Sequence, residues 1–151
     1  INLEHAGDLI ERVIVDAREK KIAHNLSFSE AGMQEIAEMH ARVVSNLRLG
    51  LSVFLTGDIR SAQQLMAEKA NFRELERKYA RSHLQRVATQ TVESIETSSL
   101  HLDVISELKR LNSLFCATAY PVLEQAGLMN RSRMKEDAPE KLGDVGEVRQ
   151  A

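Results

Sequence analysis

The clearest candidates for chemistry are two carboxylates near the start of the chain, Glu4 and Asp8. They stand four residues apart, so a helix would project both from one face, where like charges repel unless a cation lies between them. Hard divalent cations take several carboxylate oxygens, and iron sites in helical bundles use inward-pointing carboxylates. The same spacing also fits an acidic stripe in contact with water, which Glu11 would continue. Both interpretations remain open on spacing alone.

Glu68 is a second, weaker candidate for a metal ligand. It lies between Leu65 and Phe72 at three- and four-residue steps, so it borders an apolar row. It could offer a carboxylate from a second helix, or it could reach outward and pair with an Arg or Lys. The chain contains no Glu-x-x-His and no His-Glu-x-x-His, which counts against ferritin-like di-iron and zinc peptidase sites. The candidate cofactor is therefore a divalent or iron-type metal ion at Glu4 and Asp8.

Four further polar or reactive residues fall within apolar rows. We predict that His40 and His83 pack in the core, and that Asn112 bonds across the helices and fixes their register. Cys116 is expected to act as a small core hydrophobe. The chain has no Gly-rich phosphate loop, no nucleophile elbow and no cysteine pair. We therefore predict no catalytic residues and a protein that is not an enzyme.

The elements that must position these residues are helices. Apolar residues recur at three- and four-residue steps over four long stretches, at about 1–24, 27–56, 59–88 and 94–125. Two prolines and seven glycines leave these stretches almost uninterrupted. Short connections make neighbours antiparallel, so we predict an all-α, up-down bundle of about four long helices. Residues 1–127 would form the domain, and 128–151 a polar tail.

Several local signals mark the ends of these helices. Ser27 and Glu30 have the spacing of a capping box, which predicts the start of the second helix. Gly57 can take the left-handed conformation that ends this helix, and Asp58 can cap the next one. Pro121 lacks a backbone donor and should kink the fourth helix near its end.

The helix faces suggest which surfaces are free. The second helix is expected to bury a row at Met33, Ile36, His40, Val43, Leu47, Leu51 and Phe54. Leu49 and Val53 add a second row, which could be an exposed surface for a homodimer. The third helix carries many basic residues on its other faces: Arg60, Lys69, Arg73, Arg77, Lys78, Arg81 and Arg86. We interpret these as a solvated face that could also meet an acidic partner or anionic lipid.

Composition limits the classes of partner. A formal net charge of -2 gives no sign of a nucleic-acid partner, which would need a strongly basic face. One cysteine indicates a reducing compartment, and no apolar run approaches the roughly 20 residues that span a bilayer, so we expect a soluble domain. Ile1 opens the chain inside a helical pattern. We therefore expect that the chain was cut from something longer.

Two regions resemble a known family. The stretch Glu-His-Ala-Gly-Asp-Leu-Ile-Glu at 4–11 resembles the Glu-x-x-x-Asp motif of PhoU proteins. Three later stretches resemble the C-terminal, PhoU-like cytoplasmic domain of bacterial sodium/phosphate cotransporter-family proteins: Glu96-Thr-Ser-Ser-Leu-His-Leu-Asp, Leu108-Lys-Arg-Leu-Asn-Ser and Ala119-Tyr-Pro-Val-Leu-Glu. The resemblance covers roughly residues 1–127. It implies repeated three-helix units, with the first helix ending one unit and the next three forming another.

The resemblance also implies a function and a site. PhoU proteins bind metal clusters through the Glu-x-x-x-Asp residues, which implicates Glu4 and Asp8. Lys109 and Ser113 stand where Glu and Asp would recur, so the resemblance implies one weak metal site or none.

The function that the resemblance implies is a non-catalytic regulatory domain of a sodium-dependent phosphate transporter. It would lie at the cytoplasmic face of the inner membrane, and its partner would be the transmembrane domain of the same polypeptide. The alternatives are a metal-binding bundle, acting as a metal-dependent enzyme or store, and a homodimerising scaffold.

Overall fold

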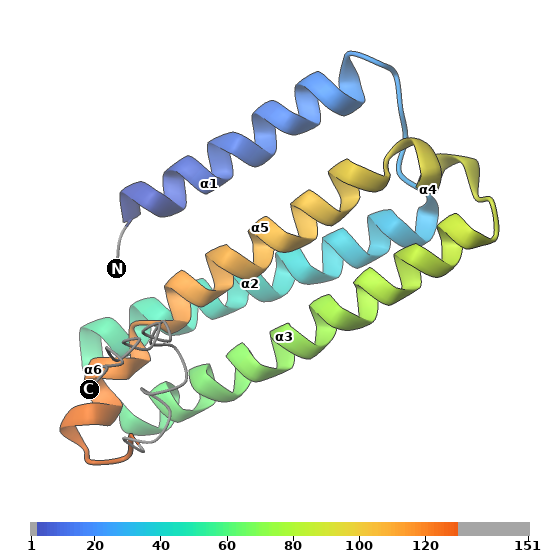
Figure 1. The fold of residues 1–151 in the computed structure, drawn as a ribbon. Helices are drawn as coiled ribbons and strands as arrows, with labels where there is room; N and C mark the ends of the chain where they lie inside the picture. The colour runs from blue at the N-terminus through green and yellow to red at the C-terminus, as the bar shows by residue number, and fades with distance from the viewer. Residues whose placement is uncertain (1–2, 130–151) are drawn as a thin grey trace, which may run out of the picture.

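A computed structural model describes residues 3–129, and within them all regular structure is helical. The elements in chain order are α1 (Leu3–Asp16), the π-helix η1 (Ala17–Ile22), α2 (Glu30–Thr56), α3 (Ile59–Ala88), α4 (Val92–Glu96), α5 (Ser98–Cys116) and α6 (Ala119–Gln125). Figure 1 shows α2, α3 and α5 side by side as a bundle, with α1 lying along the outer side of α5. The predicted all-α bundle is confirmed.

The turn between α2 and α3 has the left-handed glycine and the aspartate cap that the sequence predicted. Gly57 has a φ of 65°, in the left-handed region that favours glycine. The Asp58 side chain accepts a hydrogen bond from the backbone N–H of Ser61 at 2.8 Å and caps α3. The start of α2 was predicted two residues too early, because Ser29 accepts the cap bond from Gly32 at 3.2 Å. Phe28, which directly precedes the capping residue Ser29, packs against the core, and the first turn of α2 begins after it.

The single fourth helix predicted at 94–125 is wrong, because the structure has three helices there. The Thr97 hydroxyl donates to the carbonyl of Glu93 at 2.6 Å, where α4 ends. The Thr118 hydroxyl donates to the carbonyl of Phe115 at 2.8 Å, between α5 and α6. Pro121 lies in the first turn of α6, where its missing N–H costs little. The first helix, predicted to end near residue 24, continues past α1 without a break as the π-helix η1 and ends at Ile22.

The apolar core consists of a larger and a smaller cluster of buried side chains. The larger cluster joins α1, α2, α3 and α5, and its most deeply buried members are Leu9, Met39, Phe72 and Ile105. The smaller cluster lies at the α2–α3 turn and α6, and comprises Val53, Ala62, Leu65, Cys116, Ala119 and Leu123. The apolar row predicted at Leu65 and Phe72 of the third helix and the core role of Cys116 are confirmed.

The row predicted for the second helix is wrong by about one residue. The inner face of α2 consists of Gly32, Glu35, Met39, Val43, Asn46, Gly50 and Val53. His40 is exposed rather than packed in the core, and Leu51 and Phe54 are exposed as well. Val53 is fully buried, so the predicted dimer surface of Leu49 and Val53 is not available. Hydrophobic periodicity missed the inner face because two of its members are polar and two are glycines.

Candidate functional site

The predicted metal ligands do not come together in this fold. Glu4 and Asp8 are exposed on α1, and Glu68 is half-buried on α3, where it accepts a hydrogen bond from Asn71 at 3.4 Å. Between residues 3 and 129, no three His, Cys, Asp or Glu side chains gather closely enough to hold a metal ion. Two exposed carboxylates are too few ligands for a complete site. A metal ion at Glu4 and Asp8 therefore stays a prediction.

Lys109 and Ser113 of α5 stand where the Glu and Asp of the Glu-x-x-x-Asp motif would recur. Lys109 on α5 donates to Glu76 on α3 at 2.9 Å, with both side chains partly exposed. Ser113 is half-buried one turn further along α5. This pair links two helices of the bundle and leaves no second carboxylate pair on α5.

A buried polar cluster joins three helices at the end of the bundle near α4. We call Glu35, Arg86, His83 and His101 the polar cluster. Arg86 donates from its two Nη atoms to the two carboxylate oxygens of Glu35, each at 2.8 Å. His101 places Nε2 3.2 Å from Glu35 Oε2, and His83 stacks on His101 with ring centroids 4.6 Å apart and an interplanar angle of 15°. The cluster thus connects α2, α3 and α5 at one point.

Smaller residues around the polar cluster make room for it and share its hydrogen bonds. His83 Nε2 lies 2.8 Å from the Ser98 hydroxyl, and Arg86 also donates to Ser82 at 2.7 Å. A Cβ on Gly32 would lie 3.2 Å from Cδ2 of His101, so the glycine lets the imidazole pack close to the first turn of α2. The cluster therefore depends on the residue types around it as well as on its own members.

Burial dominates the electrostatics of the two histidines. It lowers the pKa of His101 to about 4 and also lowers the pKa of His83, so both rings are neutral at pH 7. Burial works against the charged form of Glu35 too, but the hydrogen bonds from Arg86 and Ser82 outweigh it and hold the pKa of Glu35 below its ordinary value. The carboxylate is already paired with Arg86, and both imidazoles are buried. We therefore interpret it as a structural connection between helices.

Sequence reasoning missed three of these residues. Glu35 and His101 were not singled out, and Arg86 was placed with the solvated basic residues. The signal was available in the spacing, because Glu35 falls on the row that runs through Met39 and Val43 at steps of four. His83 was predicted to lie in the core, and this is confirmed.

A second buried contact joins α2 and α5 at mid-length. The Asn46 side-chain amide donates to Oδ1 of Asn112 at 2.8 Å. Asn112 in turn lies with its Nδ2 atom 3.6 Å from Sγ of Cys116. The predicted hydrogen bond from Asn112 across the bundle is confirmed. Burial raises the pKa of the Cys116 thiol to about 11, which leaves it unreactive at neutral pH.

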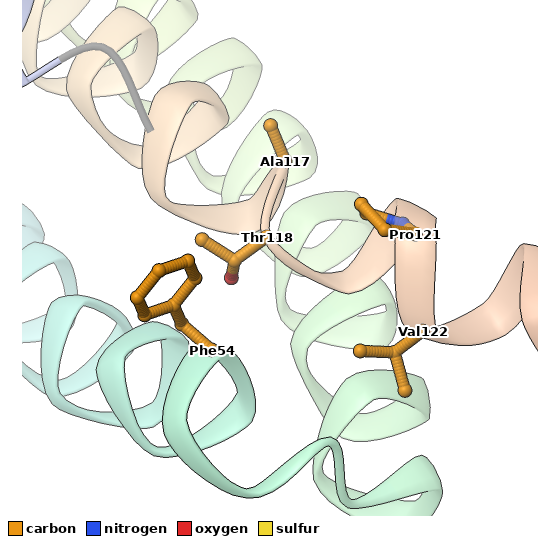
Figure 2. Close-up of a pocket in the computed structure, with 5 residues that line it drawn as sticks. All are labelled: Phe54, Ala117, Thr118, Pro121 and Val122. Carbon is orange, nitrogen blue, oxygen red and sulfur yellow. The ribbon is translucent and has the colours of Figure 1, made fainter.

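The surface feature that stands out is apolar and lies at the α2–α3 turn. Four large side chains remain exposed there, and we call them the hairpin end: Leu51 (43% exposed), Phe54 (66%), Leu55 (79%) and Ile59 (42%). Beside them lies a pocket of about 310 Å³ lined by Phe54, Ala117, Thr118, Pro121 and Val122. Figure 2 shows Phe54 of α2 facing the segment between α5 and α6 across this pocket. Such a surface suits an apolar side chain from a partner.

The fold and these surfaces define a class of protein: an all-α domain whose buried polar groups connect helices and whose apolar surface is suited to contact. Residues 36–119 match the PhoU domain, and the chain belongs to this family. Within residues 3–129, no helix has the length and apolar character needed to cross a bilayer. No solved structure gave a significant match to the chain.

Similar proteins are known from enteric bacteria. The chain is 48% identical over 125 residues to a protein of Salmonella typhimurium, and 46% identical over 125 residues to proteins of Escherichia coli K12 and Shigella flexneri. Each relative is named "Putative inorganic phosphate export protein YjbB". The match covers 83% of this chain and 23% of each relative, so the chain spans about a quarter of their length.

Proposed function

We propose that this chain is a non-catalytic regulatory domain of a sodium-dependent phosphate transport protein, acting at the cytoplasmic side of the membrane. Membership of the PhoU family and the name shared by the relatives support the link to phosphate transport. The relatives are about four times as long as the matched region, and we propose that their remaining part corresponds to the transporting, membrane-embedded partner. The hairpin end is the observation that favours regulation by contact.

The hairpin end has the properties of a docking surface. Phe54 and Leu55 are the most exposed of its side chains, and burying a large apolar side chain contributes roughly 1.5–3 kcal/mol. Because Phe54 and Leu55 are already partly covered, a partner conformation that buries both would be favoured over one that leaves them in water by roughly 40-fold or more. Such a difference is enough to shift a transport protein between two states.

Point variants in the full-length protein test this proposal. Phe54→Ser with Leu55→Ser removes the two most exposed side chains of the hairpin end. Val92→Ser with Ile95→Ser is the matched control, because these residues are 60% and 48% exposed at α4, at the opposite end of the bundle (Figure 1). Phosphate flux is measured in membrane vesicles as a function of phosphate concentration on the cytoplasmic side.

The two variants should differ in how their phosphate flux responds to phosphate concentration. We expect the hairpin-end variant to transport phosphate with a weakened response to its concentration, and the control to behave as wild type. A hairpin-end variant with wild-type flux and wild-type response would argue against regulation through this surface.

A further inference from the structure

Charge is distributed unevenly over the bundle. The α3 helix contains seven Lys or Arg and three Glu, whereas α1 contains four Asp or Glu and one Arg, in a chain with a net charge of -2. Figure 1 shows α1 and α3 on opposite sides of the layer formed by α2 and α5. The domain therefore has a basic side and an acidic side, and a charged surface would orient it.

Six of the seven cations of α3 separate into two groups in the structure, and the seventh, Arg60, is exposed at the start of the helix. Arg86 turns inward to Glu35, and Lys69 is half-buried where it donates to the Tyr120 hydroxyl, so neither belongs to the solvated face predicted from the sequence. The exposed group in the middle of the helix is Arg73, Arg77, Lys78 and Arg81, which we call the basic flank.

The basic flank lies on the exposed side of α3. Arg73, Arg77 and Arg81 follow one another at steps of four; Arg77 and Arg81 lie opposite the buried Phe72 and Tyr79, and Arg73 lies at the edge of the same exposed side. Glu74 pairs with Arg77 at 2.8 Å, while Arg73 and Arg81 make no ion pair with the described residues. Three Arg side chains thus face solvent along roughly 12 Å of helix.

This geometry favours an extended anionic surface over a small anion. A small anion needs donors that converge on one point, whereas the basic flank is a row along a convex rod. Guanidinium groups bind phosphate oxygens with two parallel hydrogen bonds, so headgroup phosphates suit them well. Leu84 is 60% exposed one turn beyond Arg81 on the same side, where it could enter the interfacial region of a bilayer.

We propose that the basic flank binds the anionic surface of a lipid bilayer and orients the domain with α3 toward the membrane. The acidic α1 helix then faces away, because an anionic surface repels it. This inference adds an orientation to the proposed function and rests on its placement beside a membrane. Vesicle binding is measured without any transport, so the two proposals can fail separately.

Vesicle flotation of the 151-residue chain tests the inference. Vesicles of phosphatidylcholine alone are compared with vesicles that contain about one-third phosphatidylglycerol, in low and high salt. We expect binding to the anionic vesicles in low salt, little binding to the neutral ones, and release in high salt. Absence of binding to anionic vesicles, or equal binding to neutral ones, would overturn the inference.

Matched charge variants then locate the binding surface. Arg73→Gln, Arg77→Gln and Arg81→Gln together should lower the partition coefficient roughly 100-fold, at about fivefold for each cation near an anionic surface. A second triple removes the same charge from exposed positions of α1, η1 and α5: Arg12→Gln, Arg18→Gln and Arg110→Gln. This control should bind as wild type.

Two comparisons make the result specific. Changing the three Arg of the basic flank to Lys keeps the charge and should retain binding within a few-fold, with the helical circular dichroism unchanged. An equal loss in the Arg12, Arg18 and Arg110 control would show that net charge alone governs binding, and would overturn the assignment to α3.

Discussion

Arg86 reaches from α3 to α2 and donates one hydrogen bond to each carboxylate oxygen of Glu35, both at 2.8 Å. The two side chains are 15% and 9% exposed, and His101 of α5 lies 3.2 Å from the same carboxylate. A bidentate pair between arginine and carboxylate fixes the orientation of both groups as well as their distance. This contact therefore sets the position of α2 against α3 at the end of the bundle.

Breaking this pair should cost much more stability than breaking an exposed one. Arg86→Met leaves the Glu35 carboxylate buried without its partner, and we expect the free energy of unfolding to fall by about 3 kcal/mol. Urea denaturation measures this change. Arg42→Met is the control, since Arg42 meets Glu38 at 3.1 Å with side chains 42% and 47% exposed, and it should change stability by less than about 1 kcal/mol. Equal losses in the two variants would contradict the structural role of the Glu35–Arg86 pair.

The polar cluster also predicts how stability depends on pH. The pKa of His101 is lowered to about 4, so the unfolded chain takes up its proton near its ordinary pKa of 6.5, well before the folded one does. Stability should therefore fall by about 3 kcal/mol as the pH decreases from 6.5 to 4, and the lowered pKa of His83 acts in the same direction.

Glu35 extends this loss to lower pH. Its pKa lies below the ordinary value of 4.5, so its contribution to stability is present above that value and disappears as the pH falls through the folded-state pKa. Urea denaturation at a series of pH values measures both effects. In His101→Leu the loss between pH 6.5 and 4 should become much smaller, and an unchanged pH profile in this variant would contradict the burial of His101.

Two glycines should respond in opposite ways to the same substitution. A Cβ on Gly50 would lie 3.0 Å from the backbone oxygen of Phe115, where α2 packs closely on the end of α5. Gly50→Ala should therefore destabilise the domain by about 1–3 kcal/mol. Nothing lies within 4 Å of a Cβ on Gly7, so Gly7→Ala should stabilise the domain by up to about 1 kcal/mol through helix propensity. Thermal unfolding of the two variants compares them, and a stabilising Gly50→Ala would contradict this packing.

The predicted metal ion can be tested on the purified protein. Glu4 and Asp8 are exposed, so we expect divalent or iron-type cations to bind no more tightly than roughly 10⁻⁴ M. Equilibrium dialysis should show that Glu4→Ala with Asp8→Ala abolishes this weak binding and that Glu68→Ala leaves it unchanged. Tight stoichiometric metal in the wild-type protein would instead support the alternative of a metal-binding bundle.

Sequence patterning predicted those parts of the fold that hydrophobicity encodes directly. The apolar row of α3 at Leu65 and Phe72 and the turn at Gly57 and Asp58 were predicted correctly, because apolar spacing and capping chemistry are local properties. The inner face of α2 was not, since Glu35 and Asn46 are polar and become internal only when Arg86 and Asn112 arrive from other helices. Polar residues that are satisfied across the bundle cannot be recognised without their partners.

The exposed apolar surface was also not predicted correctly from the sequence. The predicted dimer row included Val53, which the smaller core cluster buries, while the neighbouring Phe54 and Leu55 are exposed. A rotation of one residue, about 100° around the helix, separates these positions. Periodicity alone does not distinguish two adjacent apolar rows at the end of a helix, so the hairpin end emerged from the structure.

Removal of this domain from the full-length protein tests the central claim most directly. Phosphate flux is measured in membrane vesicles at several phosphate concentrations on the cytoplasmic side, with and without the region that corresponds to residues 1–127. A regulatory domain predicts that transport continues but no longer responds normally to phosphate. Flux and response identical to those of the intact protein would contradict a regulatory role.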